Sequence, residues 1–216
     1  MFGFFRPKVA PPVPDLPIPF GYNCAWLAIR SASVLEAALA LRLRRTEAAN
    51  WANGLGRAQA GEMFVSPAVG GWVMAISTRL PEASQRPDRE WLDRWLTRLS
   101  QRFGEAQYFG SNRVVEYQAW ARARQGQLVR AYAYLGEAGA TVWNVGPKTP
   151  EETALGLNFF DETSSEASAE GYWQRTDLRY PDEESTLTIA RRWSVDTSFS
   201  GRPYSPGVGV AGLFKG

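Results

Sequence analysis

The sequence contains no histidine, and this absence excludes more classes of protein than any motif in the chain suggests. Serine and cysteine hydrolases that use a histidine base need an imidazole, and so do metal sites with histidine ligands. Any chemistry would therefore depend on carboxylate, tyrosine, lysine or arginine side chains. We expect neither a bound metal nor a cofactor.

Cysteine is nearly absent as well, because Cys24 is the single one. No intramolecular disulfide can form, as is usual for proteins of a reducing cytosol. Cys24 precedes the apolar run Ala25-Trp26-Leu27, so a buried and inert thiol is expected rather than a nucleophile.

Long hydrophobic runs are also missing. No apolar stretch approaches the ~18 residues that a membrane span needs. The N-terminal stretch MFGFFRPKVAPPVPDLP has no basic region at its start, and prolines interrupt it, so a secretory signal is not expected. These absences predict a cytoplasmic protein without a membrane partner.

Lysine is scarce, and the net charge of +2 reflects 24 basic and 22 acidic residues. This imbalance is too small to indicate a nucleic-acid partner, and the arginines are scattered among acids. Nucleic acid is therefore an unlikely partner. The hydrophobic content of 44% in 216 residues is typical of a globular protein with an ordinary core.

Proline and glycine mark the two ends of the chain. Residues 1–20 contain six prolines and are expected to form an extended arm. Residues 200–216 are expected to form an irregular tail, and residues 21–199 a single domain. Gly207, Gly209 and Gly212 match the spacing of a dinucleotide-binding motif, but only four residues follow, too few for the helix that the motif must open.

Helix-start signals alternate with strand-like runs in the expected domain. Ser33, Thr149 and Asp182 each stand where an N-cap belongs, and a further helix is expected to begin near Thr46. The coarse order is β-α-α-ββ-α-βββ-α-α. It predicts an α+β fold with a mainly antiparallel sheet and helices packed on one face.

The segment 103–136 is the most informative part of the sequence, because two alternating strands flank Gly126. A two-residue loop at Gln125-Gly126 would pair Tyr117 with Tyr134 and mix apolar with polar faces. A three-residue loop with a left-handed Gly126 pairs Ala119 with Ala133 instead. This register puts the apolar sets together, so we prefer it.

In the preferred register, the outer face of these strands combines aromatic, basic and polar side chains. Two interpretations remain open. Helices cover the face and make it core, or the face is exposed and binds a partner, since Trp, Tyr and Arg are enriched at interface hot spots. As a nucleic-acid platform it would stack bases on its rings. The candidate binding residues are Glu116, Gln118, Trp120, Arg122, Arg130, Tyr132 and Tyr134.

Carboxylates offer the only candidate for catalysis. Glu105 and Glu116 flank Tyr108 on the expected strand and could form an acid/base pair of the kind that glycosidases use. With 22 acidic residues, however, some pair of this kind is inevitable. We therefore expect a protein without catalytic residues, and keep a carboxylate-dependent enzyme as an alternative.

Four segments carry a resemblance: GYNCAWLAIR, MFVSPAVGGWVMAIS, the run from Phe103 to Gly139, and YPDEESTLTIARRWSVD. Together they resemble a family of uncharacterised bacterial cytosolic proteins, over about residues 20–197. In type, these proteins resemble the immunity proteins that neutralise polymorphic or type VI secreted toxins. The resemblance implies a non-enzymatic protein that binds a cognate toxin, and it implies no catalytic residues.

Overall fold

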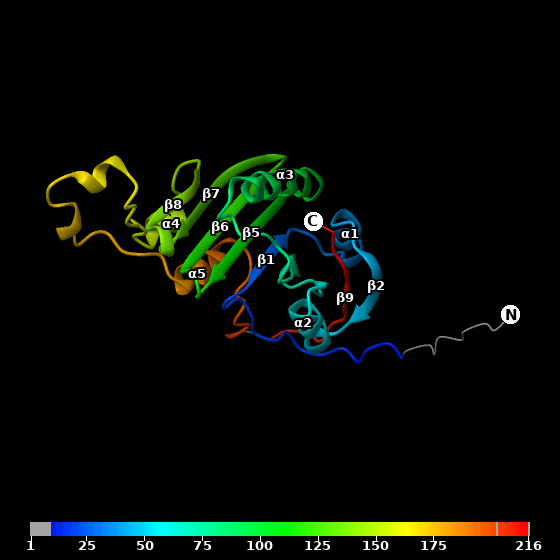
Figure 1. Cartoon of the computed structure of the whole chain (residues 1–216). Helices are drawn as coiled ribbons and strands as arrows, with labels where there is room; N and C mark the ends of the chain where they lie inside the picture. The colour runs from blue at the N-terminus through cyan, green and yellow to red at the C-terminus, as the bar shows by residue number, and fades with distance from the viewer. Residues whose placement is uncertain (1–9, 202, 216) are drawn as a thin grey trace.

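The computed structural model describes residues 10–201 and 203–215 (Figure 1). They form one nine-stranded antiparallel sheet with five α-helices packed against it, which confirms the predicted α+β fold. The strand order is β2-β9-β3-β4-β1-β5-β6-β7-β8. The strands are β1 (Ala25–Ile29), β2 (Arg44–Ala49), β3 (Met63–Val65), β4 (Val73–Ile76), β5 (Glu105–Asn112), β6 (Tyr117–Arg124), β7 (Gln127–Leu135), β8 (Ala140–Val145) and β9 (Gly209–Leu213).

Helices lie on both faces of the sheet, whereas the sequence suggested one face. Central strands cause this difference, because they are apolar on both sides: in β1, Leu27 and Ile29 enter one core, and Trp26 and Ala28 enter the other. Helices α1 and α3 cover the first core, and α2 and α5 cover the second. The helices are α1 (Val34–Ala40), α2 (Trp51–Gln59), α3 (Arg86–Phe103), α4 (Pro150–Ala154) and α5 (Glu183–Trp193), with short 3-10 turns η1 (Gly136–Ala138), η2 (Ser165–Ser168) and η3 (Tyr172–Gln174).

Several helix boundaries follow the local signals in the sequence. Thr149 caps α4 in a full capping box with Glu152, and Asp182 caps α5. Gly104 ends α3 with a φ of 83°. The segment from Thr46 is a strand rather than the expected helix, because β2 pairs with β9 and the helix begins only at Trp51.

The C-terminal segment, which was expected to be irregular, contains a strand. Residues 209–213 form β9, which inserts between β2 and β3 and pairs with both. Glycine is needed here because the neighbouring backbones come very close: a Cβ on Gly209 would lie 2.2 Å from the carbonyl oxygen of Val65. The glycine spacing that imitates a dinucleotide motif therefore serves strand packing.

The described part of the expected Pro-rich arm lies against the domain, while residues 1–9 of that arm lie outside the described residues. Asp15 forms a bridge with Gly207, and its carboxylate accepts hydrogen bonds from the backbone N–H groups of Trp51 and Ala52. It thereby supplies acceptors to the first turn of α2 from a distant part of the chain. Phe20 packs its ring against Trp26 and Trp51.

The register of the β6–β7 hairpin is the one predicted, with Ala119 opposite Ala133 and Trp120 opposite Tyr132. The loop that produces it is different. Gln125 and Gly126 both have positive φ, 48° and 81°, and form a two-residue turn. A register shift between Arg122 and Ala123 then skips one residue of β7, which restores the pairing of apolar with apolar side chains.

Candidate functional site

The predicted binding face is assembled by β6 and β7, but it is covered. Six of its seven residues share one face and are buried, with Trp120 0% exposed. The cover comes from α4, α5 and the chain after α4: Glu152 bonds Trp120, Thr186 bonds Gln118, and Phe159 packs against Trp120 and Tyr132. The core interpretation of this face is therefore right. The buried rings are not accessible as a platform for stacking bases. The six residues are Gln118, Trp120, Arg122, Arg130, Tyr132 and Tyr134.

Glu116 is the exception. It is exposed in the turn between β5 and β6, with a φ of 50°, and lies off the strand. Glu105 is buried at the start of β5, so the eight-residue strand separates the two carboxylates by roughly 24 Å at about 3.4 Å per residue. The proposed acid/base pair is therefore not formed.

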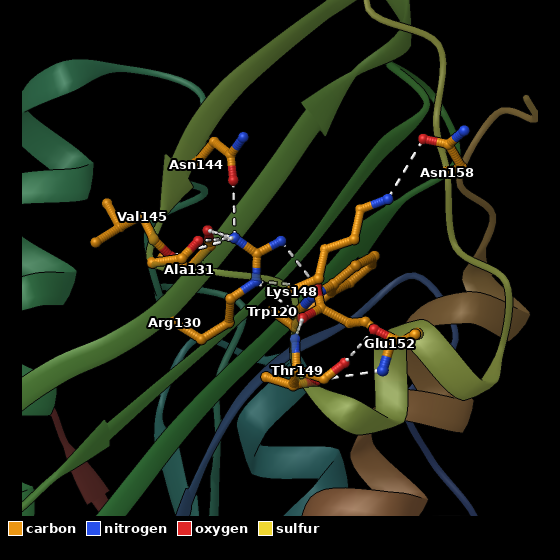
Figure 2. A network of polar contacts seen from close by, with 11 residues as sticks. Trp120, Arg130, Ala131, Asn144, Val145, Lys148, Thr149, Glu152 and Asn158 are labelled. Carbon is orange, nitrogen blue, oxygen red and sulfur yellow. Dashed lines mark hydrogen bonds and ion pairs between the residues drawn. The ribbon is translucent and has the colours of Figure 1, made fainter.

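The centre of the covered face is an ion pair between Arg130 of β7 and Glu152 of α4 (Figure 2). The guanidinium Nε donates to both carboxylate oxygens, at 3.0 and 2.9 Å, and Nη2 donates to Oε1 at 2.8 Å. The carboxylate also accepts Trp120 Nε1 at 2.9 Å and the Thr149 N–H at 2.7 Å. Nη1 of Arg130 donates to Asn144 Oδ1 at 2.7 Å and to backbone carbonyls nearby.

The surroundings of Glu152 keep it ionised. Burial alone raises its pKa, but the hydrogen bonds from Arg130 and from the Thr149 N–H outweigh burial, and the pKa lies below its ordinary value. A carboxylate held as an anion by four donors has no proton to give and no free lone pair aimed at a substrate. The pair fixes α4 on the sheet and is unsuited to acid/base catalysis.

Glu105 is engaged in the same way on the neighbouring part of the face. It accepts Arg122 Nε at 2.5 Å, Gln107 Nε2 at 2.7 Å and Arg124 Nε at 3.1 Å. Burial raises its pKa, while Arg122 and Gln107 lower it by more, so the net shift is downward. The Arg122 guanidinium also lies 5.2 Å from the ring centre of Trp193, which attaches α5 to the sheet.

Another cavity lies elsewhere and is lined by none of the predicted binding residues. It has a volume of about 670 Å³ and lies between the segment 19–25, the end of α2 and α5. Its size suits a small molecule. Cys24 lines this cavity, but burial raises the pKa of its thiol to about 12, so it stays protonated and is not a nucleophile.

A smaller cavity, of about 280 Å³, lies beside the Arg130–Glu152 pair. Its walls come from β7, β8, the chain before α4, and the chain after it. Two of the predicted binding residues, Arg130 and Tyr132, line it together with Lys148, Phe159 and Asp161.

A lobe made of residues 160–180 extends from the body next to α5 and β8, drawn in yellow to orange in Figure 1. Its centre is an aromatic cluster. Phe160 is stacked with Tyr180 at 4.9 Å and with Trp173 at 5.8 Å between ring centres. Trp173 and Tyr180 are nevertheless 50% and 51% exposed. No expectation from the sequence included this cluster, although four aromatic residues lie within this acidic segment of the sequence.

Neither a metal centre nor a membrane span is found in the described residues. No group of three or more Asp, Glu or Cys side chains there is placed to hold a metal ion. No helix in the same residues combines the length and the apolar character that crossing a bilayer requires.

Comparisons with family models, with curated proteins and with solved structures found no match to this chain.

Proposed function

We propose that this chain is a non-enzymatic binding protein of the cytoplasm, an immunity protein that neutralises a cognate bacterial toxin by direct contact. The observation that carries the proposal is the lobe of residues 160–180, which exposes Trp173 and Tyr180 on a projecting, internally packed support. Exposed tryptophan and tyrosine held in place by other rings are the side chains that most often dominate binding energy.

The binding surface in this proposal differs from the one expected from the sequence. The face of β6 and β7 holds helices α4 and α5 in place, and its residues serve the scaffold. The lobe takes the role of the recognition surface. A stacked arrangement suits this role because Phe160 limits the rotamers of Trp173 and Tyr180 before a partner arrives, which reduces the entropy lost on binding.

Charge indicates which kind of partner the lobe fits. The net charge of the whole chain is +2, but the lobe carries five acidic and two basic residues. One of the two basic residues, Arg175, is already paired with Asp177 at 2.6 Å. A partner with a basic surface around an apolar pocket would complement the lobe and would be attracted to it over distance. The acidic residues are Asp161, Glu162, Glu166, Glu170 and Asp177, and the basic ones are Arg175 and Arg179.

The test uses the product of the adjacent gene, because toxin and immunity genes are normally neighbours. Cells that express this product should survive only when the protein is co-expressed, and the two proteins should form a complex in a pull-down. If the protein gives the cells no protection and forms no complex with this product, the immunity function is refuted.

A pair of variants locates the surface. Replacing both Trp173 and Tyr180 with alanine should weaken the complex at least about 30-fold, which is the effect of losing about 2 kcal/mol from a single hot spot. Leu39→Ala is the matched control: Leu39 is 71% exposed on α1, at the other end of the sheet from the lobe. If the double alanine variant and the Leu39→Ala variant bind the partner with equal affinity, the lobe is excluded as the contact surface.

A further inference from the structure

The cavity of about 280 Å³ beside Arg130 is lined by the buried hydroxyl of Tyr132, a residue that is 5% exposed. Among the described residues this hydroxyl has no hydrogen-bond partner of normal geometry. Burial raises the pKa of Tyr132, and a weak hydrogen bond with the Thr141 side chain on the same wall lowers it by less. Buried hydroxyls in folded proteins are nearly always satisfied, so one without a well-placed partner on a cavity wall indicates a group that the cavity is built to receive.

Four charged side chains line this cavity, and the charges of two of them cancel. Arg130 and Glu152 neutralise each other in their ion pair. Lys148 and Asp161 remain, and within the described part of the chain neither forms an ion pair. Among the residues that the structure describes, the Lys148 ammonium donates to Asn158 Oδ1 alone, at 3.3 Å, and its other donors have no partner there (Figure 2). The cavity therefore presents one cation and one anion that do not satisfy each other.

The volume and the apolar surface of the cavity further limit the kinds of ligand that fit. A volume of 280 Å³ corresponds to about nine water molecules at roughly 30 Å³ each, so a ligand of about ten non-hydrogen atoms fits. Leu157 and Phe159 give one side of the cavity an apolar surface. A small molecule with two opposite charges and an apolar substituent matches the charges, the volume and the apolar wall of the cavity.

We propose that this cavity binds a small zwitterion of the amino-acid type. The ligand carboxylate contacts the Lys148 ammonium, and the ligand ammonium contacts the Asp161 carboxylate. The Tyr132 hydroxyl gains the partner it lacks, and the side chain of the ligand packs on Phe159. The site shares Asp161 with the lobe but does not include the exposed rings of Trp173 and Tyr180, and the proposal does not depend on a toxin partner.

Isothermal titration calorimetry on the isolated protein tests the proposal with the free amino acids as probes. At least one should bind with a Kd below about 1 mM. The matched amine without the carboxylate, and the matched acid without the ammonium, should each bind at least about tenfold more weakly. If no amino acid binds, or if the amine or the acid alone binds as well as the zwitterion, the proposal is wrong.

Three variants assign the contacts for the probe that binds. Lys148→Met and Asp161→Asn remove one charge each from side chains on the rim and should each weaken binding at least about tenfold. Tyr132→Phe removes only the hydroxyl and should also weaken binding. Lys215→Met, which removes a charge at a lysine that does not line the cavity, should leave the affinity unchanged. Unchanged affinity in both charge variants would refute this site even if an amino acid binds.

Discussion

Replacing Glu152 with glutamine would leave the Arg130 guanidinium buried without its counter-charge. Glu152 is 1% exposed, and its two oxygens accept hydrogen bonds from Arg130, Trp120 Nε1 and the Thr149 N–H. Glutamine has the same shape but one oxygen fewer, and its NH₂ group would face these donors. The variant therefore tests the charge and the acceptors with little change in volume.

The expected loss is large. Breaking a buried ion pair by removing one partner destabilises a protein by about 3–5 kcal/mol. For a domain of this size, each kcal/mol shifts the Tm by about 2–4 °C, so Glu152→Gln should lower the Tm by about 6–20 °C. Urea unfolding followed by tryptophan fluorescence measures the free energy directly, because several tryptophans, including Trp120, are buried.

Two further variants make the result interpretable. Glu90→Gln breaks the exposed Arg86–Glu90 pair and should change the free energy of unfolding by less than about 0.5 kcal/mol. The double variant Arg130→Met with Glu152→Gln should be more stable than Glu152→Gln alone, since the buried positive charge is gone. A loss below about 1 kcal/mol in Glu152→Gln, or additive losses in the double variant, would refute this reasoning.

Three more predictions concern the two buried carboxylates, two glycines of α2 and Asp15. The pKa values of Glu105 and Glu152 lie below the ordinary value of a glutamate carboxyl, because the hydrogen bonds from their arginine partners outweigh burial. Their contribution to stability is therefore complete above that ordinary pKa and is lost as the pH falls through the lowered values. Urea titrations from pH 7 to pH 3 should show a fall in stability that is smaller in Glu152→Gln. Gly54→Ala places a Cβ 2.2 Å from the Phe64 ring and should destabilise by about 1–3 kcal/mol, whereas Gly56→Ala, with open space, should stabilise by about 0.5–1 kcal/mol in urea unfolding. Asp15→Ala removes the acceptors at the start of α2 and should cost about 0.5–2 kcal/mol, with faster proteolysis of the N-terminal segment; no change in either would contradict the docked position of that segment.

Local signals in the sequence determined much of the fold. The register of the β6–β7 hairpin was predictable because only one pairing puts Ala119 and Ala133 on the same face as the other alanines. The turn itself was predicted wrongly, since a two-residue turn with a later register shift gives the same pairing as a longer loop. The caps at Thr149 and Asp182 were predictable because they depend on residues within one turn.

Features that depend on distant partners were not predictable in this way. Whether Trp120 is core or surface is decided by Glu152 and Phe159, which lie more than 30 positions further along the chain. β9 is rich in glycine and has a low intrinsic preference for strand, so its place between two other strands decides its conformation. The lobe has no periodic pattern, and its aromatic cluster forms only because the chain returns from Phe160 to Tyr180.

The position of β9 also determines when the protein can fold during synthesis. Ala49 of β2 pairs with Gly209, so the sheet has a gap between β2 and β3 until residues 209–213 leave the ribosome. At about 5–20 residues per second, the 160 positions from Ala49 to Gly209 take about 8–32 s to synthesise. During that time the edge of β3 is open and the Phe64 ring lacks its neighbour Ala211. The nascent chain therefore exposes an unpaired strand edge that is prone to aggregation. A chaperone that binds the nascent chain at the ribosome should raise the yield of native protein.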